Sequence, residues 1–144
     1  MPNKKTVWFM IALSFLGFLD ATYLTVKHYA GTALVCNIFS GCDVVTTSKY
    51  SEILGQPIAL LGAIYYLSMF FFLLYYLDSQ KAKVLSLAAY VTVTGFIASM
   101  TLMYIQGFVL KALCEYCVFS ALTSTILFLC GATILWKSKR LRDD

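Results

Sequence analysis

Charged residues are scarce in this chain. Asp, Glu, Lys and Arg make up 12% of its 144 residues and hydrophobic residues 60%, whereas an ordinary soluble domain has about 25% charged and about 45–50% apolar residues. A soluble globule of this size cannot bury so much apolar side chain and still present a polar surface, so the composition excludes the soluble classes and indicates a bilayer. The length leaves room for a single small domain over residues 1–144.

Four long stretches lack charge almost entirely, and each has about the length that a transmembrane helix needs. They cover about residues 7–26, 58–77, 84–105 and 115–136. No small-residue cleavage site follows the first stretch, so we expect it to be retained and not removed as a signal peptide. The sequence therefore predicts an all-α membrane protein, a bundle of four transmembrane helices.

Basic residues are distributed unevenly among the connections between these stretches. Because cytoplasmic loops carry the excess of Lys and Arg, the distribution predicts that both termini are cytoplasmic. The basic residues are also split among three short pieces and form no groove for nucleic acid. Eight of the eleven fall on one predicted side: Lys4, Lys5, Lys81, Lys83, Lys137, Lys139, Arg140 and Arg142.

This orientation places a long connection, about residues 27–57, outside the cytoplasm. A connection of about 30 residues is usually functional or carries structure of its own. Asp43 can cap a short helix that would run to Leu54, where Gly55 and Pro57 are typical stop residues. We expect this helix to lie against the outer membrane face.

Four of the five cysteines fall on the predicted outer side. Cys36 and Cys42 lie in the long connection, and Cys114 and Cys117 lie at the start of the last stretch. The outer compartment of bacteria is oxidising, which favours disulfide chemistry. Cys130 lies 13 residues further along the last stretch, about 20 Å deeper at ~1.5 Å per residue, and is interpreted as a packing residue.

Cys114 and Cys117 form a Cys-x-x-Cys pair at a predicted helix start. Residues three apart on a helix are neighbours, so the two sulfurs can join with small adjustment. Unpaired N–H groups and the helix dipole favour a thiolate there. The second pair, Cys36 and Cys42, strengthens a redox interpretation because thiol–disulfide exchange can pass electrons between two dithiols.

Two other interpretations of the four outer cysteines remain open. They could form two static disulfides, although a membrane bundle does not have the small-core problem that makes secreted domains need them. They could also bind zinc through four thiolates, but the Cys-x5-Cys spacing is looser than usual zinc sites. We favour redox exchange and expect no metal site.

In its motifs the chain resembles the bacterial branch of the vitamin K epoxide reductase family. The resemblance covers nearly the whole chain. It rests on Cys36 and Cys42, Ser48, the stretch Gly55-Gln56-Pro57 followed by Gly62 and Tyr65, and the run from Cys114 to Ser120.

The resemblance implies an oxidoreductase that reoxidises a thioredoxin-like or DsbA-like thiol oxidase and passes the electrons to a membrane quinone, ubiquinone or menaquinone. The reduced partner would attack the disulfide between Cys36 and Cys42, most readily at Cys36. Cys42 would then attack Cys114 and release Cys117 as the thiolate that faces the quinone. Ser48 matches a loop Ser/Thr that helps to hold the quinone or the quinone-side sulfur, although a hydroxyl bonded to its own backbone is an equal interpretation. Disulfide formation outside the cytoplasm, at the bacterial inner membrane, would be the result.

The chain departs from some family members at two points. Mammalian members that reduce vitamin K epoxide carry an Asn and a Tyr where this chain has Ile58 and Ala121, which argues against the alternative of epoxide or quinone reduction in the mammalian sense. Many bacterial members carry a fused thioredoxin-like domain, whereas this chain ends at Asp144, so we expect the partner in trans. A non-catalytic transporter or scaffold with structural disulfides is the other alternative.

A few further residues are candidates for the site. Asp20 is costly within a membrane span, so it either pairs or is hydrated near the outer interface, or delivers protons for quinone reduction. His28, the only histidine, is expected at the interfacial surface, with a proton role as the alternative. Among the many aromatic residues, Tyr65 and Tyr116 are expected to approach the quinone, and the others to contact lipid or the core.

Overall fold

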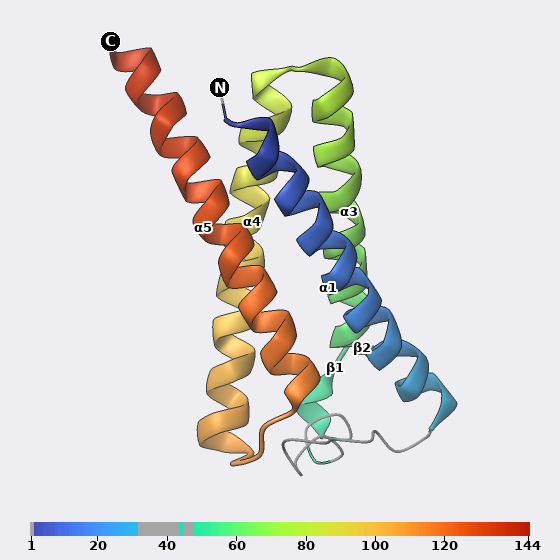
Figure 1. Ribbon diagram of the computed structural model, residues 1–144. Coiled ribbons are helices and arrows are strands. Elements are labelled where there is room, and N and C mark those ends of the chain that lie inside the picture. Colours follow the sequence, from blue (N-terminus) through green and yellow to red (C-terminus); the bar gives the residue numbers. More distant parts are fainter. Residues whose placement is uncertain (1, 32–43, 45–47) are drawn as a thin grey trace.

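The protein is a bundle of four long antiparallel helices (Figure 1). The computed structural model describes residues 2–31, 44 and 48–144. Each of the four helices is long and apolar enough to cross a membrane, and each contains one of the uncharged stretches, so the predicted all-α membrane bundle is confirmed. The helices are α1 (Lys4–Ala30), α3 (Ile58–Ser79), α4 (Ala82–Tyr104) with a π-helical continuation η2 (Ile105–Val109), and α5 (Glu115–Asp143).

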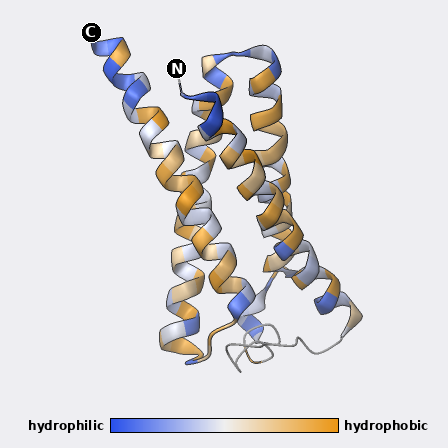
Figure 2. Ribbon diagram, in the orientation of Figure 1, coloured by the Kyte–Doolittle hydropathy of each residue, from blue (hydrophilic) through white to orange (hydrophobic). Residues whose placement is uncertain are grey.

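The outside of the bundle is apolar along the length of the helices. Figure 2 shows hydrophobic residues along the length of the helices and hydrophilic residues gathered mainly toward their ends. Large side chains such as Trp8, Phe71, Tyr90 and Leu129 are more than half exposed. Such a surface is stable in contact with lipid tails and not with water.

Both termini and the short link between α3 and α4 lie at one end of the bundle (Figure 1). The four helices are antiparallel, so the starts of α3 and α5 and the ends of α1 and α4 meet at the opposite end. The eight basic residues of the predicted cytoplasmic side therefore belong to one end, and Cys114 and Cys117 belong to the other.

The segment before α3 is a hairpin. A 3-10 turn, η1 (Lys49–Ser51), leads into strands β1 (Glu52–Ile53) and β2 (Gln56–Pro57), which pair antiparallel. Leu54 and Gly55 have φ values of 53° and 78°, and a two-residue type I′ turn requires positive φ at both positions. The expected helix from Asp43 to Leu54 is thus wrong over its last part, while Asp43 itself lies outside the described residues.

Two side-chain contacts hold this hairpin against the end of α1. Nε2 of His28 lies 3.0 Å from Oε1 of Glu52 on β1. The hydroxyl of Tyr29 donates to Oε1 of Gln56 on β2 at 2.6 Å. These contacts favour the hairpin over a helix because they tie both strands to a neighbouring element, which a local sequence pattern does not reveal.

The core is centred on Tyr66, a ring from α3 that reaches both neighbouring helices. Its side chain is 2% exposed. The ring lies directly against Gly17 of α1, and its hydroxyl donates to the carbonyl oxygen of Ser120 on α5 at 2.8 Å. Tyr66 therefore fixes the distance between the α1–α3 pair and the helix that carries the Cys-x-x-Cys pair.

Gly17→Ala is expected to lower the thermal unfolding midpoint of the detergent-solubilised protein. An added Cβ would lie 2.5 Å from the Tyr66 ring, and such overpacking costs about 1–3 kcal/mol. Gly62→Ala is the matched control, because its Cβ would lie 3.7 Å from the Cβ of Ala21, an ordinary contact. The control should keep or raise the midpoint, since alanine is the better helix former. An equal loss in both variants would contradict this packing.

Candidate active site

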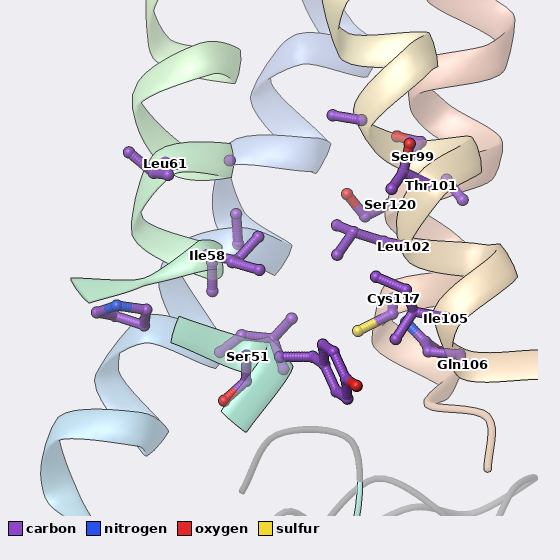
Figure 3. Close-up of a pocket in the computed structure, with 18 of the residues that line it drawn as sticks. Ser51, Ile58, Leu61, Ser99, Thr101, Leu102, Ile105, Gln106, Cys117 and Ser120 are labelled. Carbon is purple, nitrogen blue, oxygen red and sulfur yellow. The ribbon is translucent and has the colours of Figure 1, made fainter. Parts of the chain in front are cut away.

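A cavity of about 680 Å³ lies between the α1–α3 pair and the α4–α5 pair, next to the hairpin (Figure 3). Its volume is within the range of small-molecule sites, about 300–1,000 Å³. Most of its lining is apolar, including Leu24, Ile58, Leu61, Leu102 and Ile105. Polar and charged side chains contribute a smaller part of the wall, among them Asp20, His28, Lys49, Glu52, Gln106, Cys117, Ser120 and Ser124. The cavity therefore suits a largely apolar ligand that needs a small number of polar contacts.

The Cys-x-x-Cys pair lies at the edge of this cavity, at the start of α5. Cys114 is the residue that caps the helix and is fully buried. Cys117, one turn later, is partly exposed and its side chain lines the cavity (Figure 3). Both are free thiols in this structure. Of the two sulfurs, that of Cys117 is thus the one that a ligand in the cavity would meet.

The helix start makes Cys114 acidic. The thiol of Cys117 donates to the Cys114 sulfur, and the backbone N–H groups of Tyr116 and Cys117 donate to it as well. These bonds outweigh desolvation by burial and hold the pKa of Cys114 below the usual value of a thiol. A lowered pKa favours the thiolate, which is the form that reacts in thiol–disulfide exchange.

Asp20 projects from α1 into the same region. It lines the cavity, and it lies close enough to Cys114 and Cys117 that negative charges on these groups would repel one another. Within the described part of the chain, its Oδ2 atom is buried and has no hydrogen-bond partner. The two interpretations from the sequence, hydration or pairing near the interface and proton delivery, remain predictions.

Comparison with known proteins identifies the family. The model of the vitamin K epoxide reductase family matches residues 8–132. The chain belongs to the vitamin K epoxide reductase family. No curated protein matches the chain. Membership in this family implies an oxidoreductase, and the family as a whole is associated with quinones.

Several positions that carry the resemblance to the vitamin K epoxide reductase family line the cavity. Ser48, Gly62 and Tyr65 are among them. The hydroxyl of Tyr65 lies so close to Gly95 of α4 that a Cβ there would overlap it. Ile58 and Ala121, which stand where mammalian family members have Asn and Tyr, also line the cavity, so its wall is apolar at both positions.

The structure places the Tyr116 ring against α1. Among the described residues it is not one of those that line the cavity. Its ring lies 5.2 Å from the ring of Tyr23 on α1, measured between centroids. Successive side chains on a helix point about 100° apart. Because the Cys117 side chain points into the cavity, the Tyr116 side chain points toward α1.

Two of the four predicted redox cysteines lie outside the described residues. These are Cys36 and Cys42, in the chain between Gly31 and Ser48. Gly31 ends α1, and Ser48 begins the segment that leads into the hairpin and lines the cavity. Both ends of this connection are thus at the same end of the bundle as Cys114 and Cys117.

Sequence reasoning missed Gln106, which contacts both cysteines of the pair. It lies in η2, is 3% exposed, and its Oε1 accepts a hydrogen bond from the backbone N–H of Cys114 at 3.2 Å. The signal available in the sequence is an amide side chain at the end of an otherwise apolar stretch, eight residues before Cys114.

Proposed function

We propose that this protein is a quinone-dependent thiol oxidoreductase that reoxidises a thioredoxin-like or DsbA-like partner and so supports disulfide formation outside the cytoplasm. The observation that carries the proposal is the placement of the pair at the cavity. Cys117 lines a largely apolar cavity large enough for a quinone ring, and the neighbouring Cys114, whose pKa is lowered, is buried and is not among the described residues that line the cavity. One sulfur thus has access to a lipid-soluble acceptor and the other completes the disulfide.

Each protein sulfur has a defined part in this reaction. A reduced partner opens the Cys36–Cys42 disulfide, and Cys42 then attacks Cys114, so that the S–S bond to Cys117 breaks and Cys117 takes the electron pair. A quinone bound in the cavity would supply the oxidising power, because it can accept two electrons and two protons in each turnover. Cys36 attacks the Cys42 sulfur of the Cys42–Cys114 disulfide, which restores the Cys36–Cys42 disulfide and frees Cys114 as a thiolate. The Cys114–Cys117 disulfide forms again when these two sulfurs together give up two electrons, with their protons, to that acceptor.

The charge distribution supports an orientation with both termini in the cytoplasm. The eight basic residues at the termini and the α3–α4 link lie at the end of the bundle opposite the cysteine pair. Under the positive-inside rule that end is cytoplasmic. The cysteine pair would then lie on the periplasmic side of a bacterial inner membrane, where thiol oxidases act.

Vitamin K epoxide reduction in the mammalian sense is not part of the proposal. Ile58 and Ala121 line the cavity at the two positions where mammalian members carry polar side chains. Neither residue can donate a hydrogen bond to a naphthoquinone oxygen. A purely structural role for the cysteines is disfavoured because the family is one of oxidoreductases.

The protein purified from membranes is expected to carry a quinone, identified by absorbance and mass. Ala121→Phe should reduce the bound quinone by about tenfold or more, because the ring would occupy the cavity beside Cys117. Leu122→Phe is the matched control, since Leu122 is the next residue on α5 and is 59% exposed on the outside of the bundle. Equal quinone content in the two variants, with both folded, would contradict a quinone site in this cavity.

A further inference from the structure

Gln106 occupies an irregular turn at the end of α4. In this turn the N–H of Leu110 donates to the carbonyl oxygen of Ile105 at 2.9 Å, and the N–H of Ala112 donates to the carbonyl oxygen of Gln106 at 3.0 Å. Single π-helical turns within α-helices frequently occur at functional sites. Here the turn directs the Gln106 side chain inward, to the cavity wall beside Cys117 (Figure 3).

The two ends of the Gln106 amide contact different cysteines. Its oxygen accepts the backbone N–H of Cys114, which leaves the NH₂ group as the donating end. That group donates to the sulfur of Cys117. A single buried side chain thus holds the start of α5 and supplies a hydrogen-bond donor to the sulfur that lines the cavity.

A charge on Cys117 needs such a donor. The surrounding wall is largely apolar, and an unpaired charge in apolar surroundings is costly. The Asp20 carboxyl nearby is electrostatically unfavourable to a thiolate on Cys117. The Gln106 amide is neutral, so it can donate a hydrogen bond to the thiolate without placing another permanent charge beside it.

We propose that Gln106 is a positioning residue that holds the Cys117 sulfur and stabilises it as the leaving thiolate when the Cys114–Cys117 disulfide is opened at Cys114. This inference rests on the proposed function. A bond forms between the incoming thiolate sulfur and Cys114, the Cys114–Cys117 bond breaks, and its electron pair goes to Cys117. Gln106 takes no proton and no electron in this step. Its donor makes Cys117 the better leaving group, which directs the attack to Cys114.

Two substitutions separate the two ends of the amide. Gln106→Met keeps the length of the side chain and removes both hydrogen bonds. Gln106→Glu keeps an oxygen acceptor for the N–H of Cys114 but, when ionised, has no donor for Cys117 and adds a negative charge beside it. Thr123→Val is a control for the loss of a buried polar group, because Thr123 is 3% exposed and bonds only to the carbonyl oxygen of Phe119 among the contacts described.

The first measurement is the rate at which dithiothreitol reduces the Cys114–Cys117 disulfide, followed by mass spectrometry of the cysteine-containing peptides. Both Gln106 variants should react about tenfold more slowly than the unsubstituted protein. A tenfold change in rate corresponds to about the free energy of one hydrogen bond to a charged group. Thr123→Val should react at the unsubstituted rate. The thermal midpoint of each variant shows that it is folded.

The second measurement is the pH dependence of Cys117 alkylation in a Cys114→Ser background. The pH of half-maximal reactivity should rise in both Gln106 variants, and at least as far with Glu as with Met. If Gln106 only supports the backbone, Gln106→Met keeps the pH profile of the unsubstituted protein even where its rate falls, and that result would overturn the proposal. A rate and a pH profile that are unchanged in both variants would also overturn it. Neither measurement uses a quinone or a protein partner, so failure here is distinct from failure of the proposed function.

Discussion

Replacement of Cys117 by alanine is expected to abolish quinone reduction by a reduced thioredoxin-like partner. Without this sulfur no disulfide can form at the cavity, so the two electrons have no covalent route from Cys114 to a bound quinone. The loss should be at least about a hundredfold, the scale expected when a reacting group and not a neighbour is removed. The measurement is the absorbance change of ubiquinone or menaquinone with the purified protein and the reduced partner.

Cys130→Ala is the matched control for this prediction. Cys130 is a cysteine of the same helix, 13 residues further along, and it packs against the hydrophobic core. Its substitution should leave the rate within about twofold, because it removes one partly buried sulfur and no reacting group. Equal rates in the Cys117 and Cys130 variants would rule out the relay.

Replacement of Cys42 by alanine is expected to block electron transfer from the partner to the quinone while leaving the Cys114–Cys117 disulfide reducible by dithiothreitol. Cys36 then has no partner in the long connection, so no disulfide is available there for the reduced partner to attack. The small dithiol bypasses this step because it reaches the second pair directly. Quinone absorbance measures the first reaction, and mass spectrometry of alkylated peptides measures the second.

The two readouts of the Cys42 variant distinguish a broken relay from a damaged fold. Loss of quinone reduction with intact dithiol reduction supports transfer from the long connection to Cys114. Loss of both reactions would argue that the variant is misfolded, and retention of both would show that the partner reduces Cys114 directly.

The membrane bundle could be predicted from sequence because each apolar segment enters the bilayer on account of its own residues, whatever the other segments do. A helix that crosses a bilayer needs about 20 apolar residues whatever it packs against, and the stretches that α3 and α4 contain lack charge for about that length. The hairpin could not be predicted in this way. Leu54 is an unusual residue for a positive φ, and the contacts of His28 and Tyr29 that hold the strands come from a helix more than twenty residues away.

In the candidate site, too, the sequence predicts some features and the packing of the helices decides others. The Cys-x-x-Cys spacing by itself predicts two neighbouring sulfurs at a helix start, because both the 3.6-residue repeat and the exposed N–H groups belong to a single helix. Which of the two sulfurs lines a cavity depends on the rotation of α5 relative to its neighbours. The bond from Tyr66 to Ser120 helps to set that rotation, and it turns Cys117 toward the cavity and Tyr116 toward α1.

The sequence by itself determined that this protein is a membrane bundle, through its scarcity of charge and its four apolar stretches. The one-sided basic residues also determined which end of the bundle carries the positive charge. Only the tertiary structure decided that Cys117 and Gln106 share one cavity wall and that Tyr116 does not. The physical reason is the range of the interactions involved. Transfer into lipid acts on each segment separately, whereas a cavity exists only where side chains from four helices and a hairpin leave space between them.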